Sequence, residues 1–106
     1  MDPQPLEVWL ARAVLGASTD LRPVIVFEAP IRGTAKVFLV SSALDLKTDA
    51  DFSIEAEHPD FAATGLRKSS YAIAGGIREL HISAFQKRRG HLQGALALAF
   101  EAWLAG

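Results

Sequence analysis

The sequence predicts a mainly β protein that ends in one helix, with its strands forming a small, strongly bent sheet or barrel. Short apolar runs separated by Gly and Pro recur as far as Leu80, a pattern typical of strands joined by tight turns. The stretch HLQGALALAFEAWLAG (91–106) is instead rich in Ala and Leu, which favours a helix. With 106 residues, half of them hydrophobic, the chain is expected to form a single domain over residues 1–106 with a core of its own.

Three strands are expected in the N-terminal part of the chain. They are VWLARAV (8–14), RPVIVF (22–27) and AKVFLVSS (35–42). The apolar run from Val24 to Phe27 predicts burial on both faces of the second strand. Pro30 and Gly33 mark a turn, so the second and third strands should pair as an antiparallel hairpin. The polar residues 16–20 are expected to form a flexible connection.

Two further strands are expected in the middle of the chain. DFSIEAE (51–57) alternates, with Phe52, Ile54 and Ala56 on one face, which predicts a half-buried strand. TGLRKSS (64–70) is a loop in which Gly65 can take a positive φ. SYAIAGGIREL (70–80) is a strand, and its Gly75–Gly76 pair indicates a kink or a bulge.

The C-terminal helix is apolar around much of its circumference. Leu92, Leu96, Ala99 and Trp103 fall on one stripe, with Leu98 and Phe100 on its flanks. Such a helix is seldom a lone surface helix, so we expect it to pack both on the sheet and against something else. Five or six short strands with one closing helix fit an SH3-like barrel.

Charge is distributed unevenly, although the formal net charge is only −1. Residues 45–60 hold six acids and one Lys, whereas residues 61–91 hold six basic residues against Glu79 alone. Two interpretations stay open. The blocks are solvated surfaces that attract each other, or the basic block is a strip that takes a polyanion.

Several classes of protein are excluded or disfavoured. No Cys is present, which excludes disulfides and thiolate metal sites and fits a cytoplasmic location. No basic start precedes an apolar run, and no run approaches the roughly 18 residues of a membrane span, so neither a signal peptide nor a membrane partner is expected.

Metal and cofactor chemistry also lack a sequence pattern. His58, His81 and His91 have no ligand spacing, and the acidic block lacks the order of a calcium loop. No phosphate-binding or nucleophile motif occurs. We therefore expect no metal and no cofactor. Two of the histidines would suit acid and base roles in RNA cleavage, but nothing in the sequence brings them together.

Arg22 and Ser41 are the leading candidates for a site. Arg22 begins one strand of the expected hairpin, and Ser41 and Ser42 end the other. The start of one antiparallel strand lies beside the end of the next, so Arg22 and Ser41 can face the same spot. A fixed guanidinium with a hydroxyl suits a phosphate group. The alternative is that Arg22 caps a surface turn and that the serines are the polar end of a strand.

Four segments together resemble a known family. GASTDLRPVIVF, VFLVSSAL, TGLRKSSYAIAGGIREL and KRRGHLQGALALAFEAWL resemble, in this order, the MazF/PemK (Kid) family of toxin endoribonucleases. The resemblance implies the CcdB/PemK-like plasmid maintenance toxin fold, an SH3-like barrel. It also implies a homodimer, a cognate antitoxin protein as partner, and metal-independent, sequence-selective cleavage of single-stranded RNA, as in an mRNA interferase of a toxin–antitoxin system.

The resemblance also assigns roles to residues. Arg22 and Ser41 stand at the family's catalytic positions, where the substrate's 2′-hydroxyl attacks the phosphate and leaves a cyclic phosphate end. Arg22 would stabilise the charge on the phosphate oxygens, and Ser41 would donate a hydrogen bond. The residues expected to bind RNA are Thr19, Ser42, Arg67, Lys68, Arg78, Arg88 and Arg89.

The chain departs from the family pattern at several positions. Leu6–Glu7 replaces Gly-Asp, residues 18–20 replace Glu-Gln, Ser41 replaces Thr, Ser69 replaces Asp, and Gly75–Gly76 replaces an acidic-Gln pair. Two alternatives therefore stay open. One is a CcdB-like toxin that binds gyrase, and the other is a catalytically degenerate interaction module of the same fold.

Overall fold

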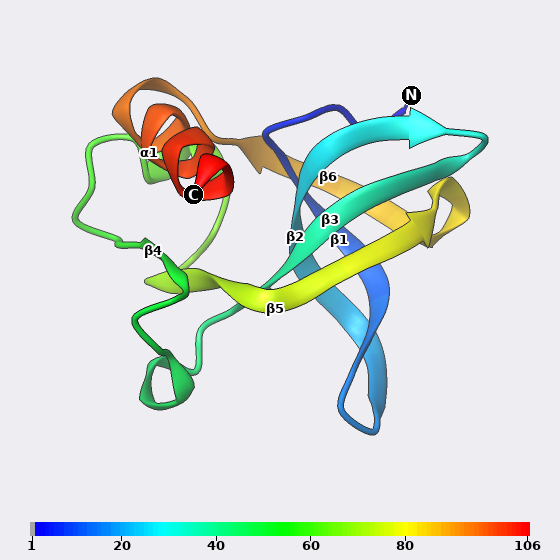
Figure 1. Cartoon of the computed structure of the whole chain (residues 1–106), viewed down its shortest axis with the longest axis horizontal. Helices are drawn as coiled ribbons and strands as arrows, with labels where there is room; N and C mark the ends of the chain where they lie inside the picture. Colours follow the sequence, from blue (N-terminus) through cyan, green and yellow to red (C-terminus); the bar gives the residue numbers. More distant parts are fainter. Residues whose placement is uncertain (1) are drawn as a thin grey trace.

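Six antiparallel strands and one C-terminal helix make up the protein in this computed structural model, which describes residues 2–106. The strands form one sheet in the order β4-β5-β3-β2-β1-β6. Their bounds are β1 Glu7–Leu15, β2 Ser18–Ile31, β3 Thr34–Ser41, β4 Phe52–Ile54, β5 Ser70–His81 and β6 Phe85–His91, followed by α1 Gly94–Ala105. The sheet curls into a half-barrel, and α1 lies at the end that carries β4 (Figure 1). The prediction of a mainly β fold with a C-terminal helix is confirmed.

The β2–β3 hairpin is present as predicted. Val24 pairs with Leu39 and Ile25 with Phe38, and the turn residues Arg32 and Gly33 both have positive φ, 54° and 78°. Two consecutive positive φ values are typical of the tight turn whose twist matches paired strands. Pro30 lies inside β2 rather than in the turn, within a register irregularity between Glu28 and Ile31 that accommodates its missing N–H.

The expectation of a flexible connection over residues 16–20 is wrong for residues 18–20. β2 begins at Ser18, which pairs with Leu15 of β1. Only Gly16 and Ala17 form the turn. Polar residues can pair here because strand pairing needs only backbone hydrogen bonds. Within the described residues, the tip of this hairpin has no further strand on either side, so its side chains can stay in solvent. The tip projects from the lower edge of the sheet in Figure 1.

The Gly75–Gly76 bulge is confirmed. Phe38 pairs with Ile77 and Val40 with Ala72, so the register of β3 against β5 shifts between these pairs. The extra residues of β5 fall at 73–76. A bulge of this kind bends its strand and increases its twist, which helps the sheet to curl.

One strand prediction needs correction, and one strand was missed. β4 spans only Phe52–Ile54, because the chain turns away after Glu55, whose carbonyl accepts a hydrogen bond from His58 N, and Ala56 is exposed. β6 was not predicted at all. Its sequence, FQKRRGH, has no apolar alternation, but it is an edge strand that pairs only with β1, and edge strands tolerate charged side chains.

The core has two parts, one on each face of the sheet. Ile25 belongs to the part that α1 covers, whereas Val24 and Val26 belong to the other, and all three are fully buried. The prediction that β2 is buried on both faces is therefore confirmed. Phe27 is only partly buried.

The buried stripe of α1 differs from the predicted one. Leu96 is 3% and Phe100 is 0% exposed, whereas Ala99 is exposed. Phe100 meets Phe38 and Phe52 edge-on, with ring centroids 6.0 and 5.3 Å away. The larger side chain therefore occupies the core, and the helix face rotates by one residue from the predicted stripe.

Candidate functional site

A pocket of about 340 Å³ opens where five segments meet: β1, the start of β2, the end of β3, the loop 65–70 and β6. Its polar lining consists of Arg22, Ser41, Ser42, Arg67, Lys68, Ser70 and Arg89, and its main apolar lining of Leu10, Leu15, Leu21, Pro23, Val40 and Leu66. Six of the nine residues proposed from the sequence for catalysis or RNA binding are therefore brought together in one place.

Arg22 and Ser41 both line this pocket, as the hairpin predicts. β2 pairs with β3 at Val24 and Leu39, and the same register continued by two residues sets Arg22 opposite Ser41. Arg22 is also held by the strand on its other side, where its Cα partner is Ala11 of β1. Two neighbouring strands thus fix the spacing of the guanidinium and the hydroxyl.

Hydrogen bonds orient both side chains. Arg22 Nε donates to the backbone oxygen of Ala13 at 3.2 Å, and the two terminal nitrogens of Arg22 have no other partner within residues 2–106. Ser41 Oγ accepts from Ala43 N at 3.1 Å. The Ser41 hydroxyl donates to no acceptor within residues 2–106, so its O–H is free to donate to a ligand. Both groups therefore offer donors to the pocket.

The loop 65–68 is held against β6 by backbone contact. Gly65 has φ +72°, and a Cβ added to Gly65 would overlap the carbonyl oxygen of Arg89. A Cβ added to Gly90 would likewise overlap the carbonyl of Ala63. Such close approach is possible only without side chains. Arg89 Nη2 donates to the oxygen of Gly65 at 3.1 Å, so this contact also positions the Arg89 guanidinium.

Two serines hold the rest of the loop. Ser70 Oγ donates to the oxygen of Lys68 at 2.8 Å. Ser69 Oγ accepts from Ala56 N at 2.8 Å, and this is the position where the resembling family has Asp. The serine thus joins the loop to the segment that follows β4. Its side chain does not line the pocket.

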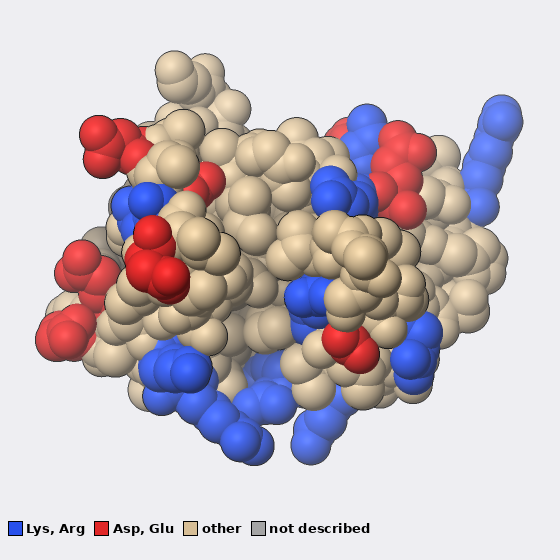
Figure 2. Space-filling view, turned by 90° about the horizontal axis from the view of Figure 1, so that it is seen from below, with Lys and Arg blue, Asp and Glu red and all other residues tan. Residues whose placement is uncertain are grey.

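The pocket carries uncompensated positive charge. The lining residues that the structure describes include Arg22, Arg67, Lys68 and Arg89 and no Asp, Glu or His. In the described part of the chain, none of these four cations takes part in an ion pair. Figure 2, viewed from the side of the β1–β2 tip, shows Lys and Arg side chains gathered along the lower edge of the molecule. A concave, cationic site of this kind attracts anions.

The other three predicted site residues lie elsewhere. Thr19 is exposed on the β1–β2 hairpin opposite Val14. Arg78, on β5, donates from Nη1 to the oxygen of Ile77 at 2.9 Å. Arg88 forms an ion pair with Glu7 at 2.8 Å. None of the three lines the pocket.

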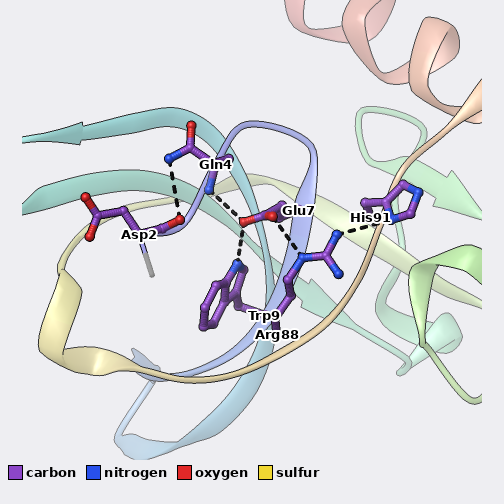
Figure 3. Close-up of polar contacts among 6 residues, drawn as sticks. All are labelled: Asp2, Gln4, Glu7, Trp9, Arg88 and His91. Atoms are coloured by element: carbon purple, nitrogen blue, oxygen red, sulfur yellow. Dashed lines mark hydrogen bonds and ion pairs between the residues drawn. The ribbon is translucent and has the colours of Figure 1, made fainter.

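Glu7 is the centre of a structural network (Figure 3). Its carboxylate accepts from Trp9 Nε1 at 3.0 Å, from Gln4 N at 2.8 Å and from Arg88 Nε at 2.8 Å. Burial alone raises the pKa of Glu7, but the hydrogen bonds from Trp9, Gln4 and Arg88 outweigh it and lower the pKa below its ordinary value. Arg88 therefore fastens β6 to the start of β1.

The acidic block does not pair with the basic block. Within residues 2–106, no ion pair joins residues 45–60 to residues 61–91. Asp51 instead accepts from Ala74 N and Thr48 N, each at 2.8 Å. Burial raises the pKa of Asp51, and these backbone hydrogen bonds lower it further than burial raises it. Within residues 2–106, the mutual attraction expected of the two blocks is not realised as ion pairs.

Sequence reasoning missed the apolar part of the lining. In the sequence, strand and turn positions are all that can be assigned to Leu10, Leu15 and Leu21. These leucines form one side of the pocket only when the β1–β2 hairpin lies beside the end of β3. Leu66 could have been suspected, because it stands beside two basic residues in a loop. In the described chain, no three His, Asp or Glu side chains are grouped as metal ligands would be. Its one α-helix is also too short to cross a membrane.

No protein-family model matches this chain, and no curated protein matches it either.

Proposed function

We propose that the protein is an endoribonuclease of the MazF/PemK type that cleaves single-stranded RNA in this pocket without a metal ion. The observation that supports it most is the pairing of Arg22 with Ser41 in a pocket lined by four unpaired cations. These are the two positions at which the resembling family has its catalytic Arg and hydroxyl. Held by neighbouring strands, they suit a single phosphate with its oxygens between them.

The proposed reaction is a transfer of the phosphodiester within the RNA. The substrate's 2′-oxygen bonds to phosphorus, and the bond from phosphorus to the 5′-oxygen of the next nucleotide breaks. The products are a 2′,3′-cyclic phosphate and a 5′-hydroxyl, which takes up the proton released from the 2′-hydroxyl. The terminal nitrogens of Arg22 and the O–H of Ser41 would stabilise negative charge on the phosphate oxygens in the transition state.

The remaining cations serve binding in this proposal. Arg67, Lys68 and Arg89 surround the pocket from the loop and from β6, where they can meet neighbouring phosphates of the strand. Contacts of this kind carry most of the salt-dependent affinity for nucleic acid. The same proposal includes a homodimer, a cytoplasmic location and inhibition by a cognate antitoxin protein.

The second candidate is a module of the same fold that binds RNA without cleaving it. One observation favours it: no described side chain in the pocket lining is a carboxylate or an imidazole, the groups that most often take a proton from a hydroxyl. The carboxylate of Glu7, which stands where the family has Asp, is engaged with Trp9, Gln4 and Arg88.

The test compares an RNA of mixed sequence with the same RNA made with 2′-deoxy sugars, both in EDTA. We expect cleavage of the first alone, with cyclic phosphate ends detected by mass spectrometry. Cleavage of both substrates, or cleavage that returns only with magnesium, would rule out the proposed reaction. Binding of intact RNA without cleavage would instead support the second candidate.

A further inference from the structure

The pocket offers hydrogen-bond donors and few free acceptors. Arg22, Arg67, Lys68 and Arg89 can only donate. Among the described lining residues, the hydroxyls of Ser41, Ser42 and Ser70 are the only side-chain acceptors. A ligand that fills this space must therefore present mainly acceptors.

Several acceptors at the pocket already have partners. Ser41 Oγ accepts from Ala43 N, the oxygen of Gly65 accepts from Arg89 Nη2, and the oxygen of Lys68 accepts from Ser70 Oγ. The oxygen of Ala13 likewise accepts from Arg22 Nε. The contacts that orient the cations thus also occupy one of the two lone pairs of each of these oxygens, which strengthens the bias toward donors.

The size and the apolar lining of the pocket fit one nucleotide. Its volume of about 340 Å³ lies at the lower end of the roughly 300–1,000 Å³ typical of ligand pockets. Leu10, Leu15, Leu21 and Leu66 supply an aliphatic surface for the face of one base. No aromatic side chain is among the described lining residues, so the pocket lacks the stacking platform of a general single-strand binder.

We propose that this pocket selects a uridine nucleotide, with its phosphate at Arg22 and its base against the leucines; the inference rests on the proposed RNA ligand but not on cleavage. Adenine, guanine and cytosine each carry an exocyclic amino group, which needs an acceptor. Uracil carries carbonyl oxygens at positions 2 and 4 and a single N–H donor at position 3. A serine hydroxyl can accept from that N–H or donate to N3 of cytosine, so the two bases differ chiefly at position 4. Cytosine has the same size as uracil but sets an amino group where uracil has O4, close to cations and with few acceptors free.

The test measures binding of uridine 3′-monophosphate and cytidine 3′-monophosphate by titration in NMR; neither nucleotide has a phosphodiester bond that the proposed reaction could break. An amino group left without a partner costs about 1–3 kcal/mol, so we expect uridine 3′-monophosphate to bind at least roughly fivefold more tightly. Inorganic phosphate should displace both. Lys87→Ala is the matched control, because Lys87 is an exposed cation of β6 outside the pocket, and it should leave the ratio unchanged.

Equal affinities, tighter binding of the cytidine nucleotide or no binding of either would overturn the inference. A loss of the uridine preference in Lys87→Ala would also overturn it, because the preference would then arise outside the pocket. If the protein cleaves RNA but shows no preference for uridine in binding, the proposed function stands and this inference is wrong. If the protein prefers uridine but cleaves no RNA, this inference stands and the proposed cleavage is wrong.

Discussion

Arg22 stands at the point where a strand enters the core. Val24, Ile25 and Val26 are fully buried two to four residues later, while Arg22 itself is only partly buried. Its hydrogen bond to Ala13 O leaves its terminal nitrogens at the pocket. A guanidinium tethered in this way loses less side-chain entropy when it binds an anion than a free surface Arg does. The position therefore combines a rigid support with an available charge.

Glu7 gives a prediction at the scale of a single residue. Its folded-state pKa lies below the ordinary value of 4.5, so the unfolded state binds a proton more readily than the folded state. The stability that Glu7 contributes is thus fully present above pH 4.5 and is lost as the pH falls through its lower folded pKa. Unfolding by urea should become easier over that acid range.

Glu7→Gln should flatten this part of the pH profile, because it removes the titrating group while keeping the shape of the side chain. Asp51 has a lowered pKa as well, so some acid sensitivity should remain in the variant. An identical profile for the variant and the parent protein, measured from neutral to acid pH, would show that the network around Glu7 is not charged in the folded state.

At the scale of elements, the strands and the helix that the sequence predicted correctly are those with a clear apolar pattern. The three N-terminal strands, the β2–β3 hairpin, the bulge in β5 and the helix follow from runs of Val, Ile and Leu or from paired glycines. β6 does not, because KRR is paired through its backbone at a sheet edge and its side chains are outside the core. The helix pattern also did not show that Phe100, and not Ala99, is buried, because this depends on contacts with Phe38 of β3 and Phe52 of β4.

The contact of β6 with the 63–65 turn gives a prediction for an element. Gly90→Ala would place a methyl group against the carbonyl of Ala63, and forcing extra atoms into a packed contact typically costs about 1–3 kcal/mol. Affinity for a phosphate ligand should fall as well, because Arg89 and the loop would shift. Gly75→Ala is the matched control, since nothing lies within 4 Å of its added Cβ.

Thermal melting with titration of a short RNA measures both effects. We expect a lower melting temperature and weaker binding for Gly90→Ala, and a change within about 0.5 kcal/mol for Gly75→Ala, as for other exposed substitutions. Equal behaviour of the two variants would mean that the β6 contact does not hold the pocket.

At the scale of the whole molecule, the site is a product of tertiary folding. The sequence predicted the meeting of Arg22 and Ser41 because both lie on one hairpin, whose geometry is local. It could not predict that Arg89 joins them while Arg88 turns to Glu7, since adjacent residues of a strand point to opposite faces and β6 itself was not recognised. The apolar wall of the pocket was likewise invisible until the β1–β2 hairpin was placed.

The molecule also leaves apolar side chains exposed around the end of α1. Ile77 is 48% and Leu104 40% exposed, and both line a groove of about 250 Å³ beside Trp103. We expect this face to support the proposed homodimer. Leu104→Asp should yield a folded monomer, because Leu104 lies outside the core. Ile31→Asp, at a more exposed position on the β2–β3 hairpin (71%), should leave the dimer intact. A monomeric parent protein in light scattering would contradict the expectation.

The most direct test of the proposed site is single-turnover cleavage of single-stranded RNA by Arg22 and Ser41 variants, with thermal melts of each. Arg22→Ala should slow cleavage by about 10²–10³, the effect of losing one preorganised electrostatic group. It should cost only about 1 kcal/mol of stability for the bond to Ala13. Arg22→Lys should not restore the rate, because it lacks the planar fork. Ser41→Ala should lose less, and Ser41→Thr should stay active. An Arg22→Ala protein that cleaves like the parent would contradict the assignment.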